Sequence, residues 1–321
     1  MIDPDPVVLS DELRLIDLRF LDLPHLIGTY VLLGDEPALV DPGPTSTLPS
    51  LEAGLAELGL ALDDIRTLLL THIHLDHAGA TGALVARYPE LQVYVHERGA
   101  PHMMSPERLL RSAGRLYGEW LEYLWGEVRP VPERNLIALR GNETLRLGRR
   151  SVHVYDAPGH AYHHVAYFDE ASGAAFVGDV AGVRLPGMPY VRPATPPPEV
   201  DLEAWQDTLD ALHAIEPSRL LLTHYGSGLD PAEHIEDFRA RLLRWAETVH
   251  QGLADGEDES AQIAQLGALA HEELGSDAES DVHVSYQLAT PIEQSWQGLA
   301  RYWRKRAERE GRTTLNSRSN D

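Results

Sequence analysis

A short cluster of metal-binding residue types lies near the end of the first quarter of the chain. Residues 71–79 read Thr-His-Ile-His-Leu-Asp-His-Ala-Gly, so three imidazoles and one carboxylate fall within six positions: His72, His74, Asp76 and His77. Neutral nitrogen donors with one anionic oxygen are what a borderline-soft divalent metal needs. The apolar run 68–70 before the cluster predicts a buried strand, and small residues after it open an amphipathic helix. Ligands between a strand end and a helix occupy the crevice favoured for sites in α/β folds.

Three further candidate ligands appear downstream, and each follows a predicted strand: His160, Asp179 and His224. His160 stands in Pro-Gly-His after a strand predicted over 151–157, and Asp179 stands in Gly-Asp after an apolar run. His224 ends the string Leu-Leu-Leu-Thr-His, which repeats residues 68–72 letter for letter. Two strands therefore deliver a His at the same kind of strand end. Two homologous half-sheets that face each other would explain both the repeat and the ligands.

The ordered set HxHxDH, PGH, GD and a late TH resembles the metallo-β-lactamase fold superfamily, in its glyoxalase II-like hydrolase branch. The resemblance covers about residues 10–250 and fills all seven expected ligand positions. It implies an α/β fold, a four-layer αββα sandwich, with two metal ions. In that family the first metal would be held by His72, His74 and His160. The second would be held by Asp76, His77 and His224, with Asp179 bridging both.

The resemblance also implies the chemistry, with two divalent ions, most often zinc, as cofactors; iron or manganese would also suit the ligands. Two such ions can share a water, lower its pKa and present hydroxide to a carbonyl. Asp76 is the catalytic candidate in this ligand set. We therefore expect a dinuclear hydrolase for thioesters, lactones or esters. A mononuclear-iron persulfide dioxygenase resembles the same pattern and is an open alternative, as is a phosphodiesterase, although the acidic charge disfavours it.

Other residues are candidates for supporting the ligands or contacting substrate. The resemblance implies that Asp41, in the turn Asp-Pro-Gly, supports the ligands without binding metal, whereas turn chemistry alone would also explain this residue. The resemblance implies the same supporting role for His164. Substrate contacts are predicted for two tyrosines next to ligands and for two residues of a stiff, proline-rich loop over 182–198: Tyr162, Tyr225, Arg184 and Tyr190.

The segment between the two ligand groups and the end of the chain both carry extra helices. A helical insertion is expected at about 97–135, because apolar residues between Pro106 and Gly126 recur at helical spacing. Its aromatic residues are expected to pack against the rest of the protein, although the insertion could instead cap the active-site cleft. We predict a catalytic domain over 1–252, a C-terminal helical extension over 253–312, with helical patterns at 261–274 and 291–309, and a disordered tail over 313–321.

Composition narrows the partners. The chain has 50 acidic and 27 basic residues, a formal charge of −23, so nucleic acid is not an expected partner. It has no cysteine, so it lacks the Cys ligand of some true β-lactamases, and antibiotic hydrolysis is disfavoured. No leader peptide or membrane-spanning run is evident, which predicts a cytoplasmic enzyme with a small-molecule substrate and no membrane partner. The C-terminal helices could pack on the catalytic domain or make a homodimer.

Overall fold

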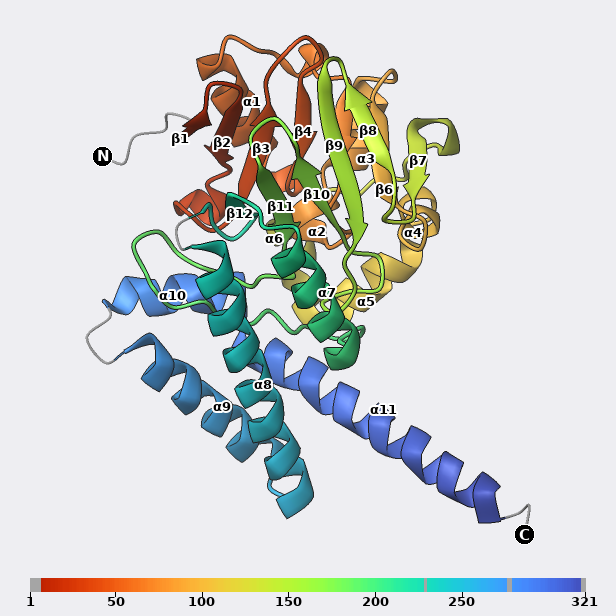
Figure 1. The fold of residues 1–321 in the computed structure, drawn as a ribbon, viewed down its shortest axis with the longest axis vertical. Helices are drawn as coiled ribbons and strands as arrows, with labels where there is room; N and C mark the ends of the chain where they lie inside the picture. The colour runs from red at the N-terminus through yellow and green to blue at the C-terminus, as the bar shows by residue number, and fades with distance from the viewer. Residues whose placement is uncertain (1–6, 228–229, 276–278, 319–321) are drawn as a thin grey trace.

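The computed structural model describes residues 7–227, 230–275 and 279–318, and it places two β-sheets face to face with helices on both outer sides (Figure 1). Apolar side chains of the two inner faces form one core, which includes Tyr30, Leu69, Phe176 and Leu221. A second core lies between the first sheet and its helices, and a third lies between the second sheet and its helices. The predicted four-layer αββα fold is confirmed.

The first sheet contains seven strands in the order in which they occur along the chain. They are β1 (Val7–Ser10), β2 (Leu13–Asp17), β3 (Gly28–Leu32), β4 (Ala38–Val40), β5 (Thr67–Leu69), β6 (Gln92–His96) and β7 (Leu136–Leu139). The β1 to β4 pairs are antiparallel, and the β4 to β7 pairs are parallel. Parallel pairing aligns the carboxyl ends of β4, β5 and β6 at one edge, where the first ligand cluster follows β5.

The second sheet has the order β12-β11-β10-β9-β8. Its strands are β8 (Thr144–Leu147), β9 (Arg150–Asp156), β10 (Val165–Asp169), β11 (Ala174–Gly178) and β12 (Arg219–Leu222). The last pair, β11 with β12, is parallel. The two copies of Leu-Leu-Leu-Thr-His thus overlap β5 in one sheet and β12 in the other, as the repeat predicted.

The outer helices cover both sheets. They are α1 (Leu48–Glu57), α2 (Leu75–Ala78), α3 (Thr81–Arg87), α4 (Ala100–Met104), α5 (Glu107–Tyr117), α6 (Leu121–Trp125), α7 (Leu202–Ala214) and α8 (Pro231–Asp255). Short 3-10 turns lie at Phe20–Asp22, Thr45–Thr47, Leu62–Asp64, Gly118–Trp120 and Glu133–Asn135. Local signals set their ends: the side chain of Asp230 accepts hydrogen bonds at the start of α8, and Gly256 ends that helix in the left-handed region.

The insertion is helical, but it is not the single helix that the spacing predicts. The chain is interrupted between α5 and α6, where Gly118 takes φ 54°. A left-handed residue cannot continue a right-handed helix, so the aromatic residues after it turn in a new direction. Trp125 then stacks on Phe20 with 5.1 Å between ring centroids.

The C-terminal extension consists of α9 (Glu259–Leu274), α10 (Ser280–Ala289) and α11 (Ile292–Arg318), of which α10 was not predicted. The predicted boundary at residue 252 falls inside α8, and Leu266, Trp296 and Leu299 share one core with Trp245 of that helix. The extension therefore packs on the catalytic domain (Figure 1). In the predicted disordered tail, 313–318 are helical, whereas 319–321 lie outside the described residues. None of the described helices is long and apolar enough to cross a membrane.

Candidate metal centre

The seven predicted ligands converge at one edge of the sandwich from loops that follow strands of both sheets. The loop after β5 and the short α2 supply His72, His74, Asp76 and His77. The second sheet supplies His160 after β9, Asp179 after β11 and His224 after β12. Their ligand atoms form two groups, each with all its atoms within 4.8 Å of one another. The structure thus brings all seven residues together.

The first group consists of His72, His74, His160 and Asp179. The Nδ1 atom of His74 lies 2.9 Å from Nε2 of His72 and 2.9 Å from Nε2 of His160. Asp179 Oδ2 is 3.5 Å from Nε2 of His160. Nitrogen atoms bound to one tetrahedral zinc ion lie roughly 3.3 Å apart, given zinc–nitrogen bonds of about 2.0 Å. The group therefore has nearly the spacing that a single ion requires.

The second group consists of Asp76, His77 and His224. Oδ2 of Asp76 lies 3.2 Å from Nε2 of His224, and Oδ1 of Asp179 lies 3.2 Å from Nε2 of His77. These contacts are short but not aligned as hydrogen bonds: His77 Nε2, His224 Nε2 and Asp179 Oδ1 are buried without a hydrogen-bond partner among the described residues. Buried polar atoms are normally satisfied, so three such atoms in one place fit a cation that they would bind.

Hydrogen bonds on the opposite side of each ring aim the free nitrogen at the centre. His160 Nδ1 donates to the Ala194 carbonyl at 2.8 Å, and His224 Nδ1 donates to the Leu26 carbonyl at 2.6 Å. A carbonyl oxygen only accepts, so Nδ1 carries a proton in both rings, and Nε2 is the atom left to bind a metal. This arrangement orients and tunes histidine ligands in metal sites.

Asp41 gives the same support to His77. Its Oδ2 accepts from His77 Nδ1 at 2.7 Å, and it also accepts from the hydroxyls of Thr71 and Thr223 at 2.7 and 2.9 Å. Thr223 precedes a ligand in the second sheet, so this one carboxylate links the two halves of the site. His164 is also buried, stacked on His72 at 4.8 Å, and its Nε2 lies 3.3 Å from the Asp179 amide. Both supporting candidates therefore lie beside the ligand groups.

The charges of the two groups differ. Burial, reinforced by neighbouring imidazoles, lowers the pKa of His72 and lowers that of His74 to about 3. Both rings are therefore neutral at neutral pH and can donate a nitrogen lone pair to a metal ion. Burial opposes charge at His77 as well, but Asp179, Asp41 and Asp76 outweigh it and raise the pKa of that ring well above its usual value. The carboxylates thus require positive charge beside them, which a divalent cation would supply in place of a proton.

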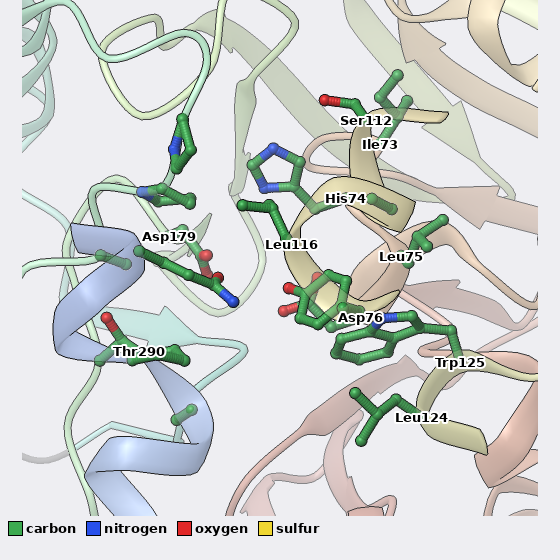
Figure 2. Close-up of a pocket in the computed structure, with 18 of the residues that line it drawn as sticks. Ile73, His74, Leu75, Asp76, Ser112, Leu116, Leu124, Trp125, Asp179 and Thr290 are labelled. Carbon is green, nitrogen blue, oxygen red and sulfur yellow. The ribbon is translucent and has the colours of Figure 1, made fainter. Parts of the chain in front are cut away.

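A cavity of about 560 Å³ opens onto the two groups. Its floor contains His74, Asp76, Asp179 and His224. One wall comes from the insertion, with Ser112, Leu116 and Trp125, and the opposite wall comes from the C-terminal segment around Thr290 (Figure 2). Residues 196–198 of the proline-rich loop also line it, together with Glu199. The cavity is large enough for a small molecule and is closed by segments far apart in the sequence.

None of the four predicted substrate contacts lines this cavity. Arg184 and Tyr190 are buried where the proline-rich loop packs under α10, and the Tyr286 hydroxyl donates to the Tyr190 carbonyl at 2.7 Å. Tyr225 is buried against His25, with ring centroids 4.8 Å apart. Tyr162 is half-buried outside the lining. Adjacency to a ligand does not set side-chain direction, which here points these groups into packing contacts.

The structure reveals cavity residues that sequence reasoning did not single out. Tyr117 of α5 lines the cavity, as does Gln294 of α11. Burial, together with the carboxylates of Asp76 and Asp179, raises its pKa, so the hydroxyl remains a neutral donor close to the metal-binding groups. Tyr117 belonged to an amphipathic stripe that favoured ordinary packing, and no sequence signal separated it from its neighbours.

A family model described as the metallo-β-lactamase superfamily matches residues 25–224, more than half of the chain. The chain belongs to the metallo-β-lactamase superfamily. Members bind divalent metal, in agreement with the His and Asp groups found here. A hydroxyacylglutathione hydrolase of Synechococcus sp. strain JA-2-3B'a(2-13) is 29% identical over 258 residues, which cover 78% of this chain and 79% of that protein. A metallo-β-lactamase fold-containing protein of Sulfurisphaera tokodaii is 26% identical over 210 residues, covering 64% and 75%.

The match to another relative is partial. A hydroxyacylglutathione hydrolase of Synechococcus sp. strain JA-3-3Ab is 34% identical over 167 residues, and the chain spans about half of its length, 52%. Among solved structures, a metallo-β-lactamase family protein of Thermus thermophilus has a TM-score of 0.71 at 24% identity, covering 94% of this chain and 95% of that one. This superfamily likeness establishes the fold, and its hydrolase members indicate a metallo-hydrolase type of site.

Proposed function

We propose that this protein is a dinuclear metal-dependent hydrolase that cleaves an activated acyl bond in a small molecule: a thioester, a lactone or an ester. The observation that carries the proposal is that two ligand groups lie side by side at one cavity, which is lined by members of both groups, including Asp76, Asp179 and His224. Zinc is the ion that we favour, because five His and two Asp give mixed nitrogen and oxygen ligands.

The proposed roles of the side chains follow from their positions. His72, His74 and His160 would hold one ion, and Asp76, His77 and His224 the other, with Asp179 facing both. When bound, the two ions would polarise the acyl carbonyl and lower the pKa of a water that attacks it. The bond from the acyl carbon to sulfur or oxygen then breaks, giving a carboxylate and a thiol or alcohol. No serine or cysteine nucleophile is required.

One carboxylate and one phenol would orient the water and the substrate around the reacting carbonyl. Asp76 lies at the cavity floor and its pKa is about 2, because the nearby His77 and His224 outweigh the burial that would raise it. It therefore remains a carboxylate that can orient a water. Tyr117 remains a neutral donor, placed to donate to an oxygen of the substrate from the wall above.

Metal content and a substrate panel test this proposal together. Elemental analysis of the purified protein should find close to two divalent ions per chain. Octanoyl thioesters, lactones, simple esters, phosphodiesters and β-lactams are then assayed with metal-loaded protein, and an acyl thioester, ester or lactone should lead. Asp179→Ala should abolish turnover, whereas Asp35→Ala, which changes an exposed carboxylate, should not.

Two outcomes would contradict the proposal. One iron per chain with oxygen uptake on a persulfide would indicate a dioxygenase. Phosphodiester turnover that exceeds every acyl substrate by orders of magnitude would show that the acidic balance of the chain does not exclude phosphate substrates.

A further inference from the structure

Three arginines of α5 face the cavity: Arg108, Arg111 and Arg115. Their spacing of three and four residues places them on one side of the helix. They span about 10 Å along its axis, at a rise of 1.5 Å per residue. The apolar side of the same helix, with Ala113 and Leu110, packs on the first core. The polar side of α5 therefore forms part of the cavity wall.

These arginines have no acidic partner in the described part of the chain, where no carboxylate lies within ion-pairing distance of any of them. Several arginines elsewhere pair with a carboxylate, as in Arg150 with Asp169 at 2.6 Å and Arg241 with Asp237 at 3.0 Å. The chain has 50 acidic residues against 27 basic ones. Three unpaired guanidinium groups at one cavity run against that excess, which supports a role toward a ligand.

The acidic side chains of the cavity are already engaged. Apart from the predicted metal ligands Asp76 and Asp179, the one acidic residue among the described lining residues is Glu199. Its Oε2 accepts from the Tyr162 amide at 3.2 Å and lies 3.4 Å from Nε2 of His163. The arginine wall is therefore the place where the cavity offers uncompensated positive charge.

The remaining lining between this wall and the metal groups is largely apolar. It includes Phe20, Leu21, Leu26, Trp125 and Leu288. An apolar surface favours binding of the hydrocarbon portion of a ligand, because removing both apolar surfaces from water lowers the free energy. A molecule that fills the cavity would thus meet metal-binding groups at the floor, an apolar middle and arginines at one side.

We propose that the site takes amphipathic acyl substrates, in which an apolar chain carries an anionic group, a carboxylate or phosphate, that Arg108, Arg111 and Arg115 bind. This inference rests on the proposed function and names its substrate class. Guanidinium groups bind carboxylate and phosphate oxygens through two parallel hydrogen bonds, which gives geometric as well as electrostatic preference. The anion can sit on the acyl chain or on the leaving group, and the test separates these two sources.

Three thioesters of equal length provide the test. S-octanoyl 3-mercaptopropionamide is neutral, S-octanoyl 3-mercaptopropionate carries its anion on the leaving group, and the suberyl monothioester of 3-mercaptopropionamide carries it on the acyl chain. One of the two anionic substrates should have a KM at least about tenfold below that of the neutral one, the size expected for one charge-assisted hydrogen bond. Raising the salt concentration should reduce that difference.

Variants then assign the effect to α5. The triple change Arg108→Gln, Arg111→Gln and Arg115→Gln should remove the preference for the anion, so that KM for the favoured anionic substrate rises to that for the neutral one. The control carries Arg66→Gln, Arg134→Gln and Arg149→Gln, which removes the same charge from exposed positions away from the cavity. The control should retain the preference. Equal KM values for neutral and anionic substrates in wild type, or equal losses in both variants, would overturn the inference while leaving the hydrolase proposal intact.

A binding measurement covers the case in which no thioester is cleaved, so that the two proposals fail separately. Calorimetry compares octyl phosphate with octanol on the metal-loaded wild type, the α5 triple variant and the control. At least about tenfold weaker binding of octyl phosphate to the α5 variant alone would support the anion subsite even without turnover. Equal binding of octyl phosphate to all three proteins would refute it.

Discussion

At the scale of single residues, Asp41 shows how one buried carboxylate organises the site. It is fully buried, takes φ 53°, and accepts hydrogen bonds from the Thr71 amide and from three side chains, which are Thr71, His77 and Thr223. The left-handed conformation is tolerated by Asp better than by most residues. The sequence left turn formation and ligand support as alternatives for Asp41, and the structure shows that this one residue does both.

Replacing this carboxylate by an amide should weaken metal binding. In Asp41→Asn an N–H donor would face the Nδ1–H donor of His77, so that ring would lose its orientation. We expect the affinity for one ion to fall about 10- to 100-fold and the free energy of unfolding to fall by about 1–3 kcal/mol. Metal titration and thermal unfolding measure both, with Asp35→Asn as an exposed control. Unchanged affinity for both ions would show that Asp41 serves the turn alone.

A histidine outside the metal centre should contribute to acid sensitivity. His234, at the start of α8, is buried and donates from Nε2 to the Ala181 carbonyl at 2.8 Å, and burial lowers its pKa to about 4. The unfolded chain takes up this proton near pH 6.5 and the folded protein only near pH 4. Stability that His234 contributes is therefore present above pH 6.5 and lost as the pH falls toward 4.

The variant His234→Gln tests this direction of the pH dependence of stability, because its side-chain amide can still donate to the Ala181 carbonyl but does not titrate. The wild type should lose about 3 kcal/mol more than the variant between pH 7 and pH 4, an order-of-magnitude value for one proton over that interval. Denaturant unfolding at each pH, with matched metal loading, measures the difference. Parallel pH profiles for the two proteins would show that His234 is not responsible.

At the scale of secondary-structure elements, the position of α11 decides the shape of the cavity. This helix lies against the proline-rich loop at Gly298, where a Cβ atom would fall 1.9 Å from the Thr195 carbonyl oxygen. The Thr195 hydroxyl also donates to the Ser295 carbonyl at 3.1 Å. The close approach brings Thr290 and Gln294 to the cavity wall. A larger residue at position 298 would push the helix away.

Two helical glycines give a matched comparison. Gly298→Ala should destabilise the protein by about 1–3 kcal/mol, because overpacking forces the backbone to move, and should raise KM for the favoured substrate. Gly267→Ala in α9 meets only Ile292, at 3.9 Å, so it should stabilise by up to about 1 kcal/mol through helix propensity. Thermal unfolding and steady-state kinetics measure the pair. Equal effects of the two substitutions would contradict the close contact between α11 and the loop.

At the scale of the whole molecule, the metal centre connects the two halves of the sandwich. His72, His74, Asp76 and His77 follow a strand of the first sheet, and His160, Asp179 and His224 follow strands of the second. Ions that bind both sets would stabilise only the state in which the sheets face each other. Binding to the folded state adds RT ln(1 + [L]/Kd) to its stability.

Metal removal should therefore lower the melting temperature of the entire protein. We expect Tm to fall by at least about 5 °C after chelation, which corresponds to roughly 2–3 kcal/mol for a chain of this size, and to recover when zinc is added. Asp179→Ala should show a smaller recovery, because that carboxylate faces both groups. Differential scanning calorimetry on protein with verified metal content measures this. An unchanged Tm after complete removal would mean that the ions do not link the sheets.

The sequence by itself determined the fold class and the members of the candidate metal centre. Each predicted ligand follows a strand within a few residues, and parallel strands end at a common edge, so local sequence was enough to place His72, His160, Asp179 and His224 near one another. The repeated Leu-Leu-Leu-Thr-His located two such edges in different sheets. The local sequence is enough to place a ligand when a short loop after a strand allows its side chain few directions.

Only the tertiary structure decided what surrounds the ligands. Tyr190 and Tyr225 were expected at the substrate and instead pack inward, whereas Tyr117 and Gln294 meet at the cavity from segments 177 positions apart in the chain. Gly118 divides the predicted insertion helix, and α10 and α11 return across the proline-rich loop to close the cavity. The lining depends on the direction of each side chain and on long-range packing, which no local pattern encodes, because the same apolar spacing serves a core contact and a cavity wall equally.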